Sequence, residues 1–411
     1  VGGVRRSAMI SLSDLSDIEM AEAKSGAWWE ENSQRSLANN SAVYKRKPTV
    51  AEFMREWDNL YKSKSGERGI FNNFGAVKAM EEQGTRDSGH MFGTNPCGEI
   101  TLRHKQFCNL TEVVVRADDT DASIANKLEQ ATILGTCQSG LTHLPFLSDE
   151  WKKNSEEERL LGVSLTGIWD NPRTCSSHAE GVSLRLRLQK WRQLTRDVNN
   201  EWAEILGINP SAAITTVKPS GTVSCLVDSA SGIHPRYAKH YIRRVRMDTK
   251  DPLCQLMMDQ GVPHEPCVVS PGAVMIFSFP IDAPESAVTR SDVSAMEHLE
   301  LWMMYKKHWT DHNPSVTIEY TDDEFMDIGA WVYKNFDDIQ GISFLPKTEH
   351  VYQQAPFETI DEQTYAVARE NMPLIKWTEL SQYEKTDTTK ASQTFACSGG
   401  QCEVVDTTES E

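Results

Sequence analysis

The feature that most constrains the fold is the alternation of two hydrophobic patterns along the chain. Apolar residues recur with helical spacing, which predicts helices at 14–29, 49–63, 121–142, 184–206, 292–310 and 358–371. Short β-rich runs predict strands at 160–168, 212–217, 273–281, 315–320 and 341–346. Because strands that alternate with helices usually form parallel sheets covered by those helices, the pattern predicts an α/β fold with mainly parallel strands.

The composition is that of a globular protein and excludes several classes of function. The chain has 411 residues, of which 39% are hydrophobic and 25% are charged, so it can bury a large core. Its net charge of −17 argues against a nucleic-acid surface, because phosphate binding depends on Lys and Arg contacts. Neither an apolar run of the roughly 20 residues that a membrane span needs nor a signal peptide is recognisable. We therefore expect a cytoplasmic protein that binds no nucleic acid and no membrane.

The cysteines are too sparse for a disulfide scaffold, and no Cys-x-x-Cys pair marks a zinc site. We therefore predict no metal-binding residues and a reducing compartment. The cysteines lie at positions 97, 108, 137, 175, 225, 254, 267, 397 and 402.

One of these cysteines lies in a polar turn motif. Segment 95–100 reads Asn-Pro-Cys-Gly-Glu-Ile, and Cys108 follows Cys97 by eleven residues. Pro and Gly beside Cys97 disfavour a helix or strand interior, so the motif predicts a loop that presents the sulfur. In an extended loop Asn95, Cys97 and Glu99 would share one side and bring together an amide, a thiol and a carboxylate that can act as a base. The alternative is a buried structural cysteine.

A second motif, Lys-Pro-Ser-Gly-Thr-Val at 218–223, directly follows the strand predicted at 212–217. A strand, a glycine-containing turn and a helix start can direct backbone N–H groups at an anion, which suits a phosphate. The alternative is an ordinary turn with a helix cap.

A third motif lies in the polar stretch 385–411, which is poor in apolar residues and is predicted to be a mobile tail. Cys397 and Cys402 can form a disulfide only across a tight turn, because the Cα atoms of a disulfide lie roughly 4.4–6.8 Å apart. Gly399 and Gly400 allow such a turn without steric cost. A zinc half-site and two idle thiols are the alternatives, although zinc lacks a second ligand pair here.

Taken in order, these motifs resemble those of class II ribonucleotide reductases, the cobalamin-dependent class. Segment 95–100 followed by Cys-Asn-Leu at 108–110 is similar to the family's finger loop and adjoining strand. Gly-Gly-Val-Arg-Arg-Ser-Ala at 2–8, the 218–222 motif and the tail cysteines follow the family's order, so the resemblance spans nearly the whole chain. It implies a ten-stranded α/β barrel over 1–384, here without its N-terminal strands, and a redox-active tail at 385–411.

The resemblance assigns roles to individual residues. Cys97 would be the thiyl radical that removes the 3′ hydrogen of the substrate, and Glu99 would be the base at the 3′ hydroxyl. Asn95 would hydrogen-bond the ribose, and Cys108 would be one of two cysteines that supply electrons as the 2′ hydroxyl leaves as water. Substrate contacts are implied for Ser7, Pro96, Gly98, Pro219, Ser220, Gly221, Thr222 and Val223. A polar loop at 32–42 would bind the effector through Asn32, Gln34, Arg35, Asn39 and Asn40.

The resemblance also implies a cofactor and partners. The sequence has no Tyr-Tyr pair for radical transfer from a second subunit, and its C-terminus carries the cysteine pair instead of a glycyl-radical site, so adenosylcobalamin is the implied radical source. The implied substrate is a ribonucleoside triphosphate or diphosphate, reduced for DNA replication under allosteric control by a deoxynucleotide or ATP. Cys397 and Cys402 would re-reduce the active site and be reset by a thioredoxin-like dithiol.

Two further expectations concern completeness and alternatives. The family's other reducing cysteine and first barrel strands should lie upstream of Val1, so we expect a fragment that needs an N-terminal partner. A pyridoxal or NAD enzyme is disfavoured, because no Gly-x-Gly-x-x-Gly motif is present. A catalytically inactive, reductase-like subunit for nucleotide binding or assembly is the remaining alternative. The presence of all four residues with an assigned chemical role argues against an inactive subunit. These residues are Asn95, Cys97, Glu99 and Cys108.

Overall fold

The computed structural model describes residues 9–26, 28–32, 34–35, 38–268, 270–347 and 353–384, together with strands at 396–398 and 401–403. The chain forms two compact units, a large unit of 7–236 and 285–347 and a small unit of 1–6, 237–284 and 348–411. This division differs from the predicted one at residue 384. The reason is that a strand within 237–284 pairs with one at 357–359 instead of joining the sheet of the large unit.

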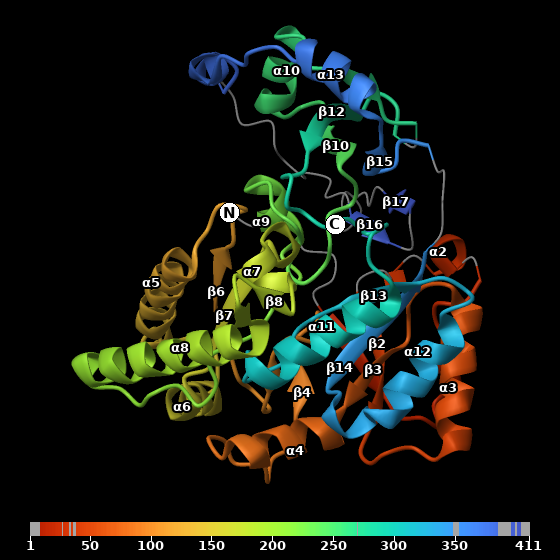
Figure 1. Ribbon diagram of the computed structural model, residues 1–411. Coiled ribbons are helices and arrows are strands. Elements are labelled where there is room, and N and C mark those ends of the chain that lie inside the picture. The colour runs from red at the N-terminus through yellow and green to blue at the C-terminus, as the bar shows by residue number, and fades with distance from the viewer. Residues whose placement is uncertain are drawn as a thin grey trace. The chain divides into compact units, whose positions relative to one another are not determined.

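The large unit is built on a five-stranded sheet in the order β1-β2-β3-β14-β13 (Figure 1). Neighbouring strands are parallel except for β3 and β14, which are antiparallel. The strands predicted at 315–320 and 341–346 are confirmed as β13 and β14. The bounds are β1 (Met9–Ser13), β2 (Ala38–Tyr44), β3 (Gly69–Asn72), β13 (Thr317–Tyr320) and β14 (Gly341–Pro346).

A second group of strands continues this sheet. β6 (Asn109–Val114) and β7 (Leu161–Thr166) form a parallel pair. Val163 on β7 bridges Thr215, and Val217 bridges Pro314 just before β13, both in the parallel sense. The segment predicted as a strand at 212–217 therefore lies between β7 and β13, although it forms only isolated bridges. Neighbouring strands thus follow one another in the order β1, β2, β3, β14, β13, the 212–217 segment, β7 and β6. The α/β fold therefore has a mixed sheet with mainly parallel pairs.

Several helices of the large unit begin at a capping side chain. Thr49 and Glu52, for example, form a reciprocal capping box at the start of α3. The helix predicted at 14–29 is instead two short helices, because Gly26 between them has a positive φ of 64°. The helices are α1 (Ile18–Glu22), α2 (Trp28–Glu31), α3 (Val50–Ser63), α4 (Asn73–Gln83), α5 (Asp121–Ser139), α6 (Asp149–Glu158), α7 (Pro172–Cys175), α8 (Leu184–Leu206), α9 (Gly221–Leu226), α11 (Ala295–His308) and α12 (Phe325–Lys334), with 3-10 turns η2 (Ile168–Asp170) and η3 (Phe336–Asp338). Short hairpins are formed by β4 (Gly93–Thr94) with β5 (Thr101–Leu102) and by β8 (His178–Ala179) with β9 (Val182–Ser183).

The core of the large unit is rich in aromatic side chains. Trp191 and Trp302 are buried in the main core cluster, and Trp28 is buried as well. α5 and α8 pack against each other, and α5 also packs on β6 and β7 (Figure 1). This packing fixes the strands whose ends carry the candidate site. Among the described residues no helix combines the length and the apolar character that crossing a membrane requires.

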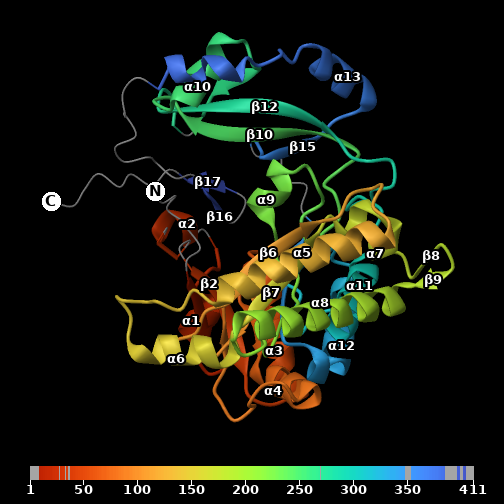
Figure 2. The same ribbon diagram turned by 90° about the vertical axis from the view of Figure 1, so that its left-hand side faces the viewer.

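The small unit is an antiparallel sheet in the order β11-β12-β10-β15 (Figure 2). Cys254 and Met257 on α10 pack with Val262 and Phe277 in its own small core. The predicted strand at 273–281 and helix at 358–371 are found as β12 and α13. The bounds are β10 (His240–Asp248), β11 (His264–Pro266), β12 (Val274–Asp282), β15 (Phe357–Thr359), α10 (Pro252–Asp259), α13 (Glu362–Glu370) and the 3-10 turn η4 (Trp377–Gln382).

Candidate active site

The finger loop at 95–100 is a tight turn between the paired strands β4 and β5. The backbone N–H of Gly98 donates to the carbonyl of Asn95 at 2.9 Å, and Gly98 has a φ of 78°, in the left-handed region that favours glycine. Cys97 therefore lies at the tip of the turn and is half-buried. The prediction that this cysteine is on a loop is confirmed.

The other two side chains of the motif do not extend beside Cys97 as predicted. Oδ1 of Asn95 accepts the backbone N–H of Ile100 at 3.0 Å, so this side chain helps to close the turn. Glu99 is fully buried, with Oε1 3.3 Å from Nζ of Lys218. The expectation of an extended segment is wrong, because the left-handed residue at 98 turns the chain. Glu99 consequently lies behind the loop tip.

Polar side chains from neighbouring strands hold the backbone of the finger loop. Ser315 Oγ donates to the carbonyl of Cys97 at 2.6 Å, and Asn39 Nδ2 donates to that of Pro96 at 2.5 Å. Asn313 Nδ2 donates to the Gly98 carbonyl at 3.1 Å, and Thr216 Oγ1 donates to the Glu99 carbonyl at the same distance. Sequence reasoning missed Thr216, Asn313 and Ser315. The available signal was that polar residues stand within or beside the apolar runs predicted as strands at 212–217 and 315–320.

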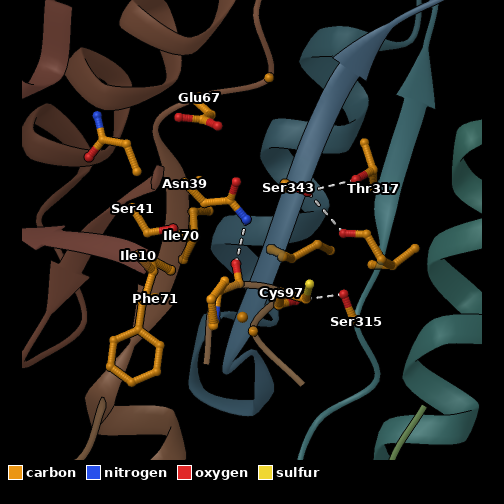
Figure 3. A pocket seen from close by; sticks show the side chains of 18 of the residues that line it. Ile10, Asn39, Ser41, Glu67, Ile70, Phe71, Cys97, Ser315, Thr317 and Ser343 are labelled. Atoms are coloured by element: carbon orange, nitrogen blue, oxygen red, sulfur yellow. Dashed lines mark hydrogen bonds between the residues drawn. The ribbon is translucent and has the colours of Figure 1, made fainter. Parts of the chain in front are cut away.

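A cavity of about 330 Å³ opens in front of Cys97. Figure 3 shows Cys97 between Ile10 and Ile70 on one side and Ser315 on the other, with Ser343 and Thr317 above it. Its volume lies at the lower end of the roughly 300–1,000 Å³ typical of small-molecule sites. The walls combine apolar side chains with amide and hydroxyl groups, as suits a polar ligand. The lining residues include Ile10, Asn39, Asn40, Ser41, Glu67, Ile70, Phe71, Pro96, Cys97, Gly98, Pro219, His234, Ser315, Thr317 and Ser343.

The cavity gathers several residues predicted for substrate and effector. Pro96, Gly98 and Pro219 line it together with Cys97, as expected of substrate contacts. Asn39 and Asn40 also line it, but they belong to β2, so the loop predicted at 32–42 is wrong for this part. The strand forms there because Asn40, Ala42 and Tyr44 are buried and alternate with less buried residues, as in a half-buried strand.

The remaining residues of the predicted effector loop lie before β2. Nε2 of Gln34 donates to Oδ1 of Asn32 at 3.3 Å, and Arg35 donates to the carbonyl of Ala23 at 2.5 Å. Neither Gln34 nor Arg35 lines the cavity. Ser7, predicted to contact the substrate, lies outside the described residues.

Two ionisable side chains that the sequence did not single out line the cavity. Glu67 forms an ion pair with Lys24 at 2.9 Å, and burial raises the pKa of Glu67 while the charge of Lys24 opposes that rise. Nε2 of His234 accepts the backbone N–H of Thr317 at 3.0 Å, and Nδ1 lies 2.9 Å from the carbonyl of Ser231. This pairing defines a neutral imidazole, and burial lowers the pKa of His234 accordingly.

Cys108 lies directly before β6, beside the buried carboxylate of Glu99. Burial raises the pKa of the Cys108 thiol, and the charge of Glu99 raises it further, while Arg86 and Lys218 oppose both effects. The thiol packs closely on β7, because a Cβ added to Gly162 would lie 3.3 Å from its Sγ. The charge of Glu99 thus acts on the Cys108 thiol.

We expect Gly162→Ala to lower the free energy of unfolding by about 1–3 kcal/mol, the cost of overpacking a close-packed site. The new Cβ would lie 2.4 Å from Cδ2 of Leu110, and it would also press on Ile100 at 3.1 Å. The matched control Gly93→Ala places its Cβ 3.8 Å from the nearest atom, so its effect should stay below about 0.5 kcal/mol. Urea denaturation measures both variants. Equal stabilities would contradict the close packing of β6 on β7.

The 218–223 motif turns the chain beside the cavity. Ser220 adopts a positive φ of 51° and precedes α9, so the predicted helix after the turn is confirmed, and it begins at Gly221. Pro219 reaches the cavity wall, and Val223 is exposed. The backbone N–H of Lys218 donates to Ser164 Oγ at 2.8 Å, which ties the segment to β7.

The tail cysteines lie on two short antiparallel strands, β16 (Ala396–Ser398) and β17 (Gln401–Glu403). Cys397 stands directly opposite Cys402 in the register of this pair. Directly opposed residues of antiparallel strands have Cα atoms about 4.5–5.5 Å apart, within the range of a disulfide. Residues 399–400, where the turn between the two cysteines is predicted, lie outside the described residues.

Comparisons with known proteins point to one kind of enzyme. No family model matches the chain. The chain is 27% identical over 403 residues to the adenosylcobalamin-dependent ribonucleoside-triphosphate reductase of Levilactobacillus brevis, covering 89% of this chain and 51% of the relative. It is 26% identical over 377 residues to the enzyme of the same description from Euglena gracilis, covering 89% and 49%. The chain therefore spans about half the length of the curated relatives it matches.

Solved structures share the fold. A crystal structure of a B12-dependent class II ribonucleotide reductase superposes with a TM-score of 0.73 at 23% identity, covering 91% of this chain and 55% of that one. The α subunit of the Actinobacillus ureae class Id ribonucleotide reductase superposes with a TM-score of 0.55 at 14% identity, covering 82% and 70%. The α/β fold of this chain is thus similar to that of ribonucleotide reductases.

Proposed function

We propose that this chain carries the radical-bearing part of an adenosylcobalamin-dependent ribonucleotide reductase, which replaces the 2′ hydroxyl of a ribonucleotide with hydrogen. The observation that carries the proposal is the position of Cys97, at the tip of a turn held by side chains of neighbouring strands and facing a cavity. The similarity to ribonucleoside-triphosphate reductases over 89% of the chain supports the same reaction, and a triphosphate as substrate.

The cavity fits the nucleoside part of such a substrate. Its volume of about 330 Å³ is of nucleoside size, and its amide and hydroxyl groups can hydrogen-bond ribose hydroxyls. Pro219, Ser220, Gly221, Thr222 and Val223 are proposed to hold the phosphates, because their segment starts at the cavity wall. A corrin is larger than this cavity of about 330 Å³, so adenosylcobalamin would have to bind outside it. That the relatives depend on it supports the same cofactor for this chain.

The residues behind and at the tip of the finger loop are proposed to share the chemistry. Cys97, as a thiyl radical, would take the 3′ hydrogen of the ribose. Glu99 would accept the 3′ hydroxyl proton on Oε2, which has no hydrogen-bond partner among the described residues. The side-chain oxygen of Asn95 already accepts a hydrogen bond within the turn, so its Nδ2 would be the group that donates to the ribose. Cys108 would supply electrons together with a second cysteine from outside this chain.

The paired tail cysteines are proposed to restore the reduced site. Cys397 or Cys402, as a thiolate, would attack the disulfide formed at Cys108, and the resulting tail disulfide would be reduced by a thioredoxin-like dithiol. We also propose that a deoxynucleotide or ATP effector binds near Asn32, Gln34 and Arg35.

The sheet edges support the proposal that an N-terminal partner completes the site. Within the described part of the chain, β1 pairs only with β2 and β6 only with β7. Both outer edges therefore present backbone groups that further strands can pair with. Counting the bridging segment at 212–217, two strands between β6 and β1 would complete a ten-stranded barrel.

We expect the isolated chain to form no measurable deoxynucleotide, because the second reducing cysteine and the two strands are supplied from outside. Adding a polypeptide that carries the N-terminal part of the enzyme should start turnover. The assay is chromatographic detection of deoxyadenosine triphosphate formed from ATP with adenosylcobalamin and dithiothreitol. Turnover by the isolated chain would refute the need for a partner. If the combined chains change the adenosylcobalamin spectrum in no way and form no product, the alternative of an inactive reductase-like subunit is favoured.

A further inference from the structure

Lys218 lies where the finger loop meets the 218–223 segment. Its Nζ is 3.3 Å from Oε1 of Glu99, whose side chain is fully buried. The side chain of Lys218 is 23% exposed, so its ammonium group is only partly hydrated. Because a buried carboxylate without a counter-charge is strongly unfavourable, this ammonium group stabilises Glu99 in its buried position.

Other acidic groups share the same ammonium group. At the Cys108 thiol, burial and the charge of Glu99 raise the pKa, whereas Arg86 and Lys218 lower it. Burial also raises the pKa of Glu112 on β6, and the charge of Lys218 again opposes the rise. The positive charge of Lys218 thus acts on one thiol and two carboxyl groups.

Arg86, the second cation near Cys108, is already engaged elsewhere. Its Nη2 forms a buried ion pair with Oε2 of Glu158 at 2.9 Å, and its Nη1 donates to the carbonyl of Thr101 at 3.0 Å. Lys218 is therefore the cation that contacts Glu99.

The main chain of Lys218 is held on both sides. Its N–H donates to Ser164 Oγ at 2.8 Å on β7. Its carbonyl packs against Gly232, where a Cβ would lie 2.3 Å from the Lys218 oxygen and where φ is +58°. The reach of the ammonium group toward Glu99 is therefore set by a fixed backbone.

We propose that Lys218 is a positioning residue of this site: its ammonium group fixes Oε1 of Glu99, leaves Oε2 to accept a proton, and balances negative charge at Cys108. The proposal deepens the proposed function and rests on the roles given there to Glu99 and Cys108. When the Cys108 thiol loses its proton to solvent, Lys218 stabilises the thiolate and Glu99 destabilises it. The two residues therefore act on the same sulfur with opposite signs.

The test is the rate at which iodoacetamide alkylates each cysteine of the isolated chain at one pH, followed by mass spectrometry. The thiolate is the reacting species, so the rate reports its fraction. We expect Lys218→Met to slow alkylation of Cys108 about three- to tenfold and Glu99→Gln to accelerate it by about the same factor. Lys218→Arg keeps the charge and should stay within about twofold of wild type. The exposed Cys137 reports reagent quality, and the buried Cys254 reports unfolding.

Lys127→Met is the matched control. It removes another lysine ion pair of the large unit, in which Nζ of Lys127 lies 2.5 Å from Oδ2 of Asp119, and it should leave Cys108 unchanged. If the role of Lys218 were merely structural, its removal would loosen the site and would accelerate alkylation of Cys108. That result, or an unchanged rate, overturns the proposal.

Alkylation of Cys254 in Lys218→Met would show that this variant does not fold. The test then rests on Glu99→Gln. If Cys108 of Glu99→Gln is alkylated no faster than in the wild type, the proposal is overturned. The assay contains no nucleotide and no cofactor. Failure of the combined chains to form deoxynucleotide would thus refute the proposed function without altering these rates.

Discussion

Replacement of Cys97 by serine should abolish deoxynucleotide formation by the chain combined with the proposed N-terminal partner, lowering kcat/KM by at least ~10³-fold, or about 4 kcal/mol of transition-state stabilisation. A serine O–H bond is stronger than a thiol S–H bond, so the oxygen-centred radical that would have to replace the thiyl radical is much harder to form. The turn itself should persist, because Ser315 bonds the backbone carbonyl of residue 97 and not its side chain. Chromatography of the nucleotide products measures the loss.

The control for this substitution is Cys137→Ser, which changes an exposed thiol on α5 that does not line the cavity. It should leave both the rate and the stability unchanged. If Cys97→Ser retained more than about a tenth of the wild-type rate while folding normally, the sulfur would have no part in the reaction.

Replacement of Cys397 by serine should spare a first turnover and block repeated ones when a thioredoxin-like protein is the reductant, with a steady-state rate at least ~10²-fold lower. In the proposed reaction the first turnover would use electrons already stored at Cys108 and at the second cysteine, which is proposed to come from the partner. The next ones require exchange with the tail pair, whose strands place Cys397 opposite Cys402. Rapid-quench measurement of product separates the two phases. Dithiothreitol, which is small enough to reach the site directly, should restore much of the rate.

Cys402→Ser should behave in the same way, because either serine prevents the tail disulfide. Normal multiple turnover of either variant with the protein reductant would show that the tail is not the electron carrier. A loss of the first turnover as well would instead indicate a structural role for the hairpin.

The sequence predicted those parts of the fold that rest on local periodicity. The strands β13 and β14 and the helices α3, α5 and α8 follow from apolar spacing, and α3 and α5 also begin with capping boxes. β2 was missed, because its small polar residues read as a loop and become a strand only through pairing with β1 and β3. The small unit was missed for a similar reason, since β10 and β15 are about a hundred residues apart in sequence and their pairing is a long-range contact.

The candidate site shows the same limit. Cys97 could be placed on a loop from its neighbouring proline and glycine alone. The orientation of Glu99 could not, because it depends on the positive φ of Gly98 and on Lys218, which lies 119 residues further along the chain. Thr216, Asn313 and Ser315 hold the loop through its backbone carbonyls, so their side chains form no sequence motif of their own.

The most direct measurement of the radical at Cys97 is electron paramagnetic resonance of the combined chains, freeze-quenched with substrate and adenosylcobalamin. An unpaired electron on sulfur couples to the two β-hydrogens of the same cysteine. We predict a signal that narrows when the chain is prepared with β-deuterated cysteine and that is absent from the Cys97→Ser variant. A signal unaffected by deuteration, or one that persists in that variant, would contradict a thiyl radical at this position.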